Sequence, residues 1–221
     1  MSILQKLPFT QCEPGPEQID GIGNYYIQIL GHAPAKDLLS TLYFLDSHGG
    51  IENHDYDFIK PDQIQWFKDV SETQRSAIKN DDKDKYMSMA FIHIPVPEFG
   101  DDPTLKIHSG CRREPTEGAS VNSHFYDACL EEGISAICCG HDHANDFCAQ
   151  RDKDLWLCYS GSCGWGGYGS YGNKHFHRRA RVFLIDTKTG SLQTWMRVEY
   201  GTGRVGELVL VGGRSVIDNP G

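Results

Sequence analysis

The stretch Ile134–Cys139 (ISAICC), which runs directly into Gly140–His143 (GHDH), decides the fold class of this chain. A short apolar run of this kind is typical of a strand that is buried on both faces of a parallel sheet. The helical pattern Ser123–Glu132 comes before it, and the strand pattern Met87–Ile94 (MSMAFIHI) comes before that helix. This order predicts a βαβ unit within an α/β fold, in which both strands end at the same edge of the sheet.

The surrounding sequence extends this unit into one domain of mixed strands and helices. Lys60–Asp62 (KPD) predicts the start of a helix, because proline is favoured at the first helical position. Gly100–Gly118 is expected to be a polar loop. The remaining strand patterns are Asn24–Leu30 and Thr41–Leu45, which predict a hairpin, Leu155–Tyr159, and a second hairpin formed by Arg181–Asp186 and Leu192–Glu199.

Composition narrows the classes of function. Lys and Arg total 21 against 30 Asp and Glu, and the net charge of -9 argues against binding to the phosphate backbone of nucleic acids. No apolar run approaches the roughly 18 residues of a membrane-spanning helix, so we expect no membrane partner. The eight cysteines form no C-x-x-C pair, which disfavours a zinc ribbon. Without an apolar leader we expect reduced thiols and a cytoplasmic location.

Histidines follow both predicted strands of the βαβ unit. His141 and His143 come directly after the second strand, and His93 lies at the end of the first, before Pro95. Ligands of α/β sheets gather outside the carboxyl ends of strands, and imidazole suits Zn, Fe, Mn or Ni. Taken alone, each histidine has a plainer interpretation: the loop pair is solvated or caps backbone, and His93 is a core residue bonded to backbone. Together they favour a metal site.

These motifs resemble a known family. F-x-H-x-P at Phe91–Pro95 followed by G-H-D-H at Gly140–His143 is similar to the C-terminal half of the calcineurin-like metallophosphoesterases. Further blocks resemble the purple-acid-phosphatase-like branch of that family, namely Gly21–Tyr25, Leu42–Gly49, Ile59–Trp66, Gly140–Cys148, Tyr159–Gly172 and Arg178–Asp186. The resemblance implies the C-terminal half of a four-layer α/β/β/α sandwich with mixed sheets. Residues 1–200 would form this partial domain, and residues 201–221 a Gly-rich tail with one strand pattern at Leu208–Val211.

The resemblance also implies a ligand set. His93 and His141 match ligands of the second metal, and His143 matches a ligand of the first metal. In the complete domain two divalent or trivalent ions, Fe, Mn or Zn, would activate water against a phosphate ester. Asp142 and Asn145 lie beside these histidines and are expected to accept hydrogen bonds from imidazole N–H groups.

Other ligands of the family are missing from this pattern. The family carries an upstream D-x-H, a G-D that bridges the metals and a G-N-H-[DE] that includes the catalytic histidine. Gly23–Tyr25 keeps only the G-N, and Asp46–His48 has the D-x-H spacing but lies in a block that the family carries in addition to its true D-x-H. We therefore expect half of a catalytic domain that holds at most one metal, and we assign no catalytic residue.

Two functions stay open at this point. The first is metal-dependent hydrolysis of phosphate monoesters, including those of phosphoproteins. The second is a truncated, non-catalytic module that binds one metal or a partner, with apolar strand edges such as Ile134–Cys139 left unpaired. Four arginines and two histidines are weaker candidates for phosphate contact, and we favour surface charge and solvated side chains for them: Arg112, Arg113, Arg178, Arg179, His175 and His177.

Overall fold

The computed structural model describes residues 3–34, 36–151, 154–165, 168–169 and 176–212, and their strands form two sheets. The larger sheet has the strand order β1-β2-β3-β5-β7-β6-β4. Its strands are β1 (Tyr25–Leu30), β2 (Leu38–Phe44), β3 (Met87–Phe91), β4 (Lys106–Ser109), β5 (Ala136–Cys139), β6 (Cys148–Gln150) and β7 (Trp156–Tyr159). The smaller sheet has the order β10-β9-β8, with β8 (Arg179–Asp186), β9 (Ser191–Val198) and β10 (Val205–Val211).

Four neighbouring strands of the larger sheet, β2, β3, β5 and β7, run parallel. The antiparallel pair of β1 and β2 confirms the predicted first hairpin. The predicted βαβ unit is confirmed as well, because β3 and β5 are adjacent and parallel and the helix α2 (Phe125–Glu131) lies between them in sequence. Loops that follow the parallel strands therefore leave the sheet at one edge.

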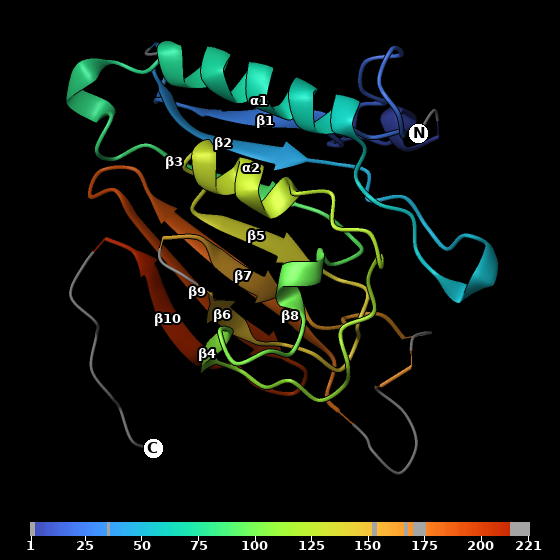
Figure 1. Ribbon diagram of the computed structural model, residues 1–221. Coiled ribbons are helices and arrows are strands. Elements are labelled where there is room, and N and C mark those ends of the chain that lie inside the picture. The colour runs from blue at the N-terminus through green and yellow to red at the C-terminus, as the bar shows by residue number, and fades with distance from the viewer. Residues whose placement is uncertain (1–2, 35, 152–153, 166–167, 170–175, 213–221) are drawn as a thin grey trace.

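Two helices cover one face of the larger sheet (Figure 1). The helix α1 (Pro61–Ser76) begins at the predicted proline, where the side chain of Gln63 accepts a hydrogen bond from the Lys60 N–H at 2.7 Å. Phe67 of α1 is fully buried and meets Tyr43 of β2 and Phe125 of α2 edge-on, with ring centroids 5.1 and 5.3 Å away. Short 3₁₀ turns lie at Leu4–Lys6, Glu52–His54, Asn80–Asp82 and Pro97–Phe99.

The smaller sheet packs on the opposite face of the larger one (Figure 1). A second apolar cluster joins Met87, Met89 and Trp156 of the larger sheet to Leu192 and Leu210 of the smaller one. The indole N–H of Trp156 also donates to the Leu210 carbonyl at 2.8 Å. The mixed α/β fold is thus confirmed, and the described residues supply three layers, helices, large sheet and small sheet, of the expected sandwich.

Several boundaries differ from the predicted ones. Two short strands, β4 and β6, occupy sequence that carries no strand pattern of useful length, and β4 lies inside the predicted polar loop. The strand β10 begins at Val205, earlier than the pattern at Leu208 indicated, and pairs with β9 within the smaller sheet. The expectation that Ile134–Cys139 would expose an apolar edge was wrong, because β5 lies between β3 and β7.

Cys148 on β6 and Cys158 on β7 form a disulfide, where we expected reduced thiols. The two residues are directly opposite in the antiparallel register of these strands, which brings their sulfurs together.

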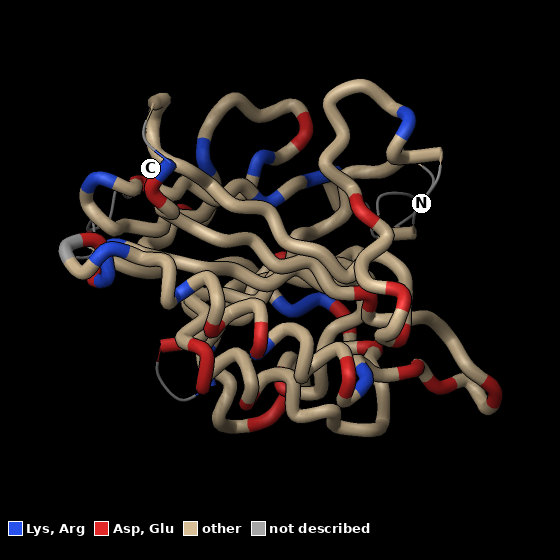
Figure 2. Tube along the Cα trace, turned by 90° about the horizontal axis from the view of Figure 1, so that it is seen from above, with Lys and Arg blue, Asp and Glu red and all other residues tan. Residues whose placement is uncertain are grey.

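The charged residues of both signs lie mainly on the segments around the strands (Figure 2). Among the described residues, no helix has the length and apolar character needed to cross a membrane.

Replacement of Phe67 by alanine tests the helix–sheet core. We expect Phe67→Ala to lower the free energy of unfolding by about 3–5 kcal/mol, because a fully buried ring leaves a cavity between α1, α2 and the sheet. Gln65→Ala on the exposed face of the same helix is the control and should change it by less than about 0.5 kcal/mol. Urea denaturation followed by circular dichroism measures both, and equal effects would contradict this packing.

Candidate functional site

Histidines from two strand ends meet at the carboxyl edge of the larger sheet. His93 follows β3 and His141 follows β5, and their ring centroids are 5.3 Å apart with the ring planes nearly perpendicular, at 80°. The rings face each other because β3 and β5 are parallel neighbours and end at the same level. The sequence-predicted pair is therefore brought together by the topology of the sheet.

Backbone contacts fix the position of His93. The hydroxyl of Ser47, in the loop after β2, accepts hydrogen bonds from the N–H groups of His93 and Ile94 at 3.1 and 2.8 Å. The His93 carbonyl in turn accepts the Gly140 N–H at 3.1 Å. A Cβ at Gly140 would lie 3.4 Å from Nδ1 of His93, so glycine leaves room for the imidazole.

His141 has an unusual backbone conformation. Its φ of 69° is in the left-handed region, which costs a residue with a side chain on the order of 1–3 kcal/mol. This turn directs the imidazole toward His93 on one side and toward Tyr56 on the other, whose ring meets it edge-on at 4.7 Å. His48, His54 and His124 share this conformation, so it is the contact with His93 that makes His141 a candidate functional residue.

Both imidazoles of the pair favour the neutral form. Partial burial lowers the pKa of His93, and the neighbouring His141 and His143 lower it further. Partial burial also lowers the pKa of His141, while the carboxylates of Glu117 and Glu114 act in the opposite direction. Neutral imidazole is the form that binds metal ions, so this environment is suited to a metal ligand at neutral pH.

His143 has different surroundings. Its ring stacks on Tyr168 with a centroid distance of 4.3 Å, and its Nδ1 lies 3.1 Å from the Tyr168 carbonyl oxygen. This contact uses one ring nitrogen and leaves Nε2 for other partners. His143 lies in the same loop as His141, but its assignment as a ligand of a separate metal stays a prediction.

Asp142 is almost fully buried, at 1% exposure. It accepts a hydrogen bond from the hydroxyl of Tyr159 and two of 3.3 Å from the Glu117 N–H. Burial raises the pKa of Asp142 to about 6, partly opposed by the hydrogen bond from Tyr159. Within the described part of the chain, the Asp142 carboxylate therefore accepts hydrogen bonds from the Glu117 N–H and the Tyr159 hydroxyl, and not from an imidazole N–H.

Asn145 also holds backbone. Its Oδ1 accepts the N–H groups of Arg113 and Glu114 at 2.8 and 3.2 Å, and its amide donates to the Glu114 carbonyl at 3.1 Å. The Glu114 carboxylate in turn accepts a hydrogen bond from the Ala144 N–H at 2.7 Å. Residues 113–117 therefore cross the histidine loop. We expected Asn145 to accept hydrogen bonds from imidazole N–H groups, whereas in the structure it binds the backbone of this crossing segment.

This crossing creates a hollow of about 420 Å³ in front of the histidine loop. Its lining combines imidazole, carboxylate and phenol side chains, from Tyr56, Glu114, Pro115, Glu117, His141, Asp142, His143 and Tyr168. The sequence analysis missed Tyr56, Glu114, Glu117 and Tyr168, because they come from loops without a motif. The acidic side chains make the hollow attractive to cations.

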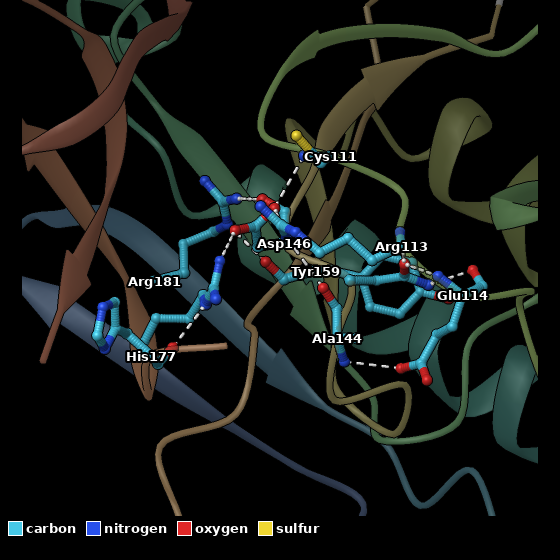
Figure 3. Close-up of polar contacts among 10 residues, drawn as sticks. Cys111, Arg113, Glu114, Ala144, Asp146, Tyr159, His177 and Arg181 are labelled. Atoms are coloured by element: carbon cyan, nitrogen blue, oxygen red, sulfur yellow. Dashed lines mark hydrogen bonds and ion pairs between the residues drawn. The ribbon is translucent and has the colours of Figure 1, made fainter. Parts of the chain in front are cut away.

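Asp146 fastens the histidine loop to the rest of the molecule (Figure 3). Its carboxylate is 7% exposed, forms ion pairs with Arg113 at 2.7 Å and with Arg179, and accepts the Cys111 N–H at 2.8 Å. The guanidinium of Arg181 donates to the Asp146 carbonyl at 2.6 Å and to the Tyr159 carbonyl at 2.7 Å. Since Arg179 and Arg181 belong to β8, this cluster joins the smaller sheet to the histidine loop. We call the pairing of Asp146 with Arg113 and Arg179 the clamp.

The weaker candidates have other roles. Asp46 accepts the N–H groups of Ile22 and His48 at 2.8 and 2.9 Å. Nε2 of His48 lies 2.8 Å from the Gln63 side-chain oxygen, so this D-x-H orders the loops around α1.

The arginine candidates also differ from the expectation. Arg113 and Arg179 form ion pairs with the buried Asp146 and are not surface charges. His175 lies outside the described residues. Arg112 and Arg178 are mostly buried beside Asp101 and Glu199, and the His177 carbonyl accepts from Arg179.

The donor set of the paired imidazoles fits one metal ion. In the described part of the chain the ring nitrogens of His93 and His141 form no hydrogen bonds, and rings about 5–6 Å apart can share an ion at metal–nitrogen distances of about 2.0–2.1 Å. The described residues contain no group of three or more His, Cys, Asp or Glu side chains arranged around one ion position. The described residues therefore offer two imidazole donors at this edge and no preformed centre of three or more ligands.

The described residues form a mixed α/β sandwich with a histidine pair at the carboxyl edge of its parallel strands. Residues 10–145 match the family model of the calcineurin-like phosphoesterases, so the chain belongs to this family. The earlier resemblance to the family and to its purple-acid-phosphatase-like branch is confirmed.

Relatives support the same assignment. The chain is 36% identical to "Probable inactive purple acid phosphatase 29" of Arabidopsis thaliana, over 90% of this chain and 56% of that protein. It is 33% identical to "Phosphatase DCR2" of Saccharomyces cerevisiae, over 89% of this chain and 36% of that protein. The chain thus spans about half, or less, of the length of these curated relatives.

Among solved structures, GAP50, the anchor in the inner membrane complex of Plasmodium, matches 89% of this chain and 60% of its own. The TM-score is 0.43 and the identity 15%, a likeness too low to support an inference about this chain.

Removal of the Asp146 carboxylate tests the clamp. We expect Asp146→Ala to lower the free energy of unfolding by about 3–5 kcal/mol, because Arg113 and Arg179 would lose their shared buried partner. Asp127→Ala is the control: Asp127 is exposed, pairs with the exposed His124, and should contribute at most about 1 kcal/mol. Urea denaturation midpoints decide between them, and a loss at Asp146 no larger than at Asp127 would refute the clamp.

The clamp also predicts a pH dependence. Burial alone would raise the pKa of Asp146, but the hydrogen bonds from Arg113, Cys111 and Arg179 lower it below its ordinary value of 3.8. Because the pKa is lower in the folded state, the carboxylate stabilises the fold above about pH 4, and this contribution is lost as the pH falls further. The Tm difference between wild type and Asp146→Asn should be constant from pH 7 to 5 and shrink below pH 4. A difference that grows on acidification would contradict this assignment.

Proposed function

We propose that this chain carries the histidine-bearing part of a metal-dependent phosphoesterase site, which acts on phosphate monoesters when the family's remaining ligands complete it. The observation that carries the proposal is the pairing of His93 and His141 at the carboxyl edge of the parallel strands. Family membership supports phosphate esters as the substrate class, and our proposal includes phosphoproteins among them. The net charge of -9 disfavours nucleic acid as a substrate.

The residues of the hollow suggest how such a site works. The neutral imidazoles of His93 and His141 would hold the cation, and Ser47 and Gly140 keep His93 in place to do so. A bound cation of this type lowers the pKa of its water and polarises a phosphoryl oxygen. The carboxylates of Glu114 and Glu117 would repel a phosphate ester before a cation binds, so we infer that the ester enters only after the cation.

A non-catalytic binding module is the second candidate function. Three of the relatives are named "Probable inactive" purple acid phosphatases, and another is named a phosphatase. Within the described residues the two paired imidazoles lack a bridging carboxylate, and without one the repulsion between two close cations disfavours a dinuclear centre. This observation favours a chain that binds one cation and, by itself, does not turn over substrate.

Metal uptake tests the first part of the proposal. We expect His141→Ala to weaken Zn²⁺ or Mn²⁺ binding by more than about tenfold, because it removes one imidazole of the pair. His177→Ala is the control, since its carbonyl rather than its ring contacts Arg179, and it should leave the affinity nearly unchanged. Isothermal titration calorimetry measures both. Equal effects would show that the histidines are ranked wrongly.

Turnover tests the second part. With Mn²⁺, Fe²⁺ or Zn²⁺ present, we expect the chain alone to hydrolyse p-nitrophenyl phosphate at the same background rate as its His93→Ala/His141→Ala variant. The reason is that the pair lacks the further carboxylates and the catalytic histidine of the family. Turnover by the wild-type chain that the double substitution abolishes would show that the described site is catalytically sufficient.

A further inference from the structure

The outer edge of β1 is open to a further strand. β1 is the first strand of the larger sheet, and β2 pairs with it on one side only (Figure 1). Within the described residues, the backbone of Tyr25–Leu30 forms hydrogen bonds with β2 and with no other segment. The N–H and C=O groups on its other side can therefore pair with another strand.

The sequence of β1 does not protect this edge. Native sheet edges usually carry charged residues, proline or a bulge that discourage pairing. The segment Tyr25–Leu30 (YYIQIL) has no charge and no proline, and the irregularity near its end places the extra residue, Leu39, on β2. The other three edge strands that the structure describes all carry charges, namely Lys106 in β4, Arg179, Arg181 and Asp186 in β8, and Glu207 in β10.

β1 is complementary to itself in an antiparallel register centred on Ile27. In this register Ile27 lies opposite Ile27 of the partner subunit, and Tyr25 lies opposite Ile29 of the partner subunit, all on one face of the joined sheet. Directly opposed aromatic and β-branched side chains stabilise an antiparallel pair. On the other face, where Gln28 bonds to Gln74 of α1, Tyr26 lies opposite the partner's Gln28.

A hollow beside the start of β1 fits the side chain that this register brings to it. The hollow has a volume of about 440 Å³ and is lined by Glu13, Pro14, Gly15, Pro16, Asn24, Tyr25, Tyr26 and Trp66. In the same register Leu30 of the partner subunit lies opposite Asn24, on the face that carries Tyr26. Leu30 is 46% exposed, so its burial against these aromatic and proline side chains would favour association.

The charges that flank β1 favour the antiparallel orientation. In residues 13–24, before the strand, the charged side chains are Glu13, Glu17 and Asp20, and all three are exposed. In residues 31–36, after the strand, the charged side chain is Lys36, which is exposed as well. An antiparallel pair brings the acidic flank of each copy to the basic flank of the other, whereas a parallel pair would bring like charges together.

We propose that the outer edge of β1 is a self-association surface, at which two copies of this chain pair their β1 strands antiparallel about a two-fold axis through Ile27. The larger sheets of the two copies then form one continuous sheet. Such a contact is isologous, since the same residues of both copies meet, and it closes as a dimer. The inference does not depend on the proposed metal binding.

Analytical ultracentrifugation of two matched variants tests the surface. Tyr26→Lys places a charge on the open edge of β1, and Ile107→Lys places the same charge on β4, at the opposite edge of the same sheet. The two side chains are similarly exposed, at 40% and 43%, and thermal melting establishes that both variants are folded. We expect the wild type and Ile107→Lys to dimerise alike, and Tyr26→Lys to raise the dissociation constant by more than about tenfold.

Engineered cysteines test the register. We expect Ile27→Cys to form a disulfide-linked dimer on oxidation, because directly opposed residues of an antiparallel pair are close enough for a disulfide. Ile29→Cys, on the same face, is the control: it faces Tyr25 of the partner subunit and should link no more than the wild-type chain, whose own cysteines set the background. Electrophoresis without reductant measures the linked fraction.

A wild-type chain that sediments as a monomer up to its solubility limit would overturn the proposal. A dimer that Tyr26→Lys leaves intact, or that both lysine substitutions weaken equally, would show that β1 is not the contact. Equal linking of the two cysteine variants would overturn the pairing centred on Ile27.

Discussion

The shared pairing of Asp146 with Arg113 and Arg179 is the interaction on which the candidate site depends. It connects three parts that are distant in sequence: the loop after β5, the segment at residues 111–117 and the edge strand β8 of the smaller sheet. The cluster adds little net stability relative to a well-packed apolar core, because three charged groups had to leave water. Its value is specificity, since only one placement of the loop satisfies the carboxylate and both arginines. That placement sets the position of His141 and of the segment that crosses it.

The clamp positions the residues that determine which ligands the carboxyl edge of the larger sheet can bind. Parallel strands β3 and β5 end together and present His93 and His141 to one another. Partial burial lowers the pKa of both imidazoles, while the crossing segment adds carboxylates to the hollow that His141 lines. An edge lined by carboxylates and imidazoles favours cations over anions. The paired imidazoles offer two donors to a cation, and in the proposed function the remaining ligands come from outside the described residues.

The sequence predicted the parts of this arrangement that are local. Pro61 marked the start of α1, and the apolar run of β5 with its following histidines located the sheet edge. Strands β4 and β6 were missed because runs of three or four residues are too short to show a periodicity. The roles of Asp142 and Asn145 could not be predicted, because their partners, Tyr159 and the backbone of residues 113–117, are set by tertiary folding. Glu117 gave no signal for the same reason: nothing in a polar loop indicates that it crosses a histidine turn more than 20 residues further along.

The central claim is that His93 and His141 share one metal ion. Anomalous diffraction at the zinc edge, from crystals of the chain grown with Zn²⁺, tests it most directly. The account predicts one strong peak between the two rings, with nitrogen atoms of both histidines at about 2.0–2.1 Å. A zinc ion bound elsewhere, or crystals in which the space between the two imidazoles stays free of metal at saturating Zn²⁺, would contradict the account.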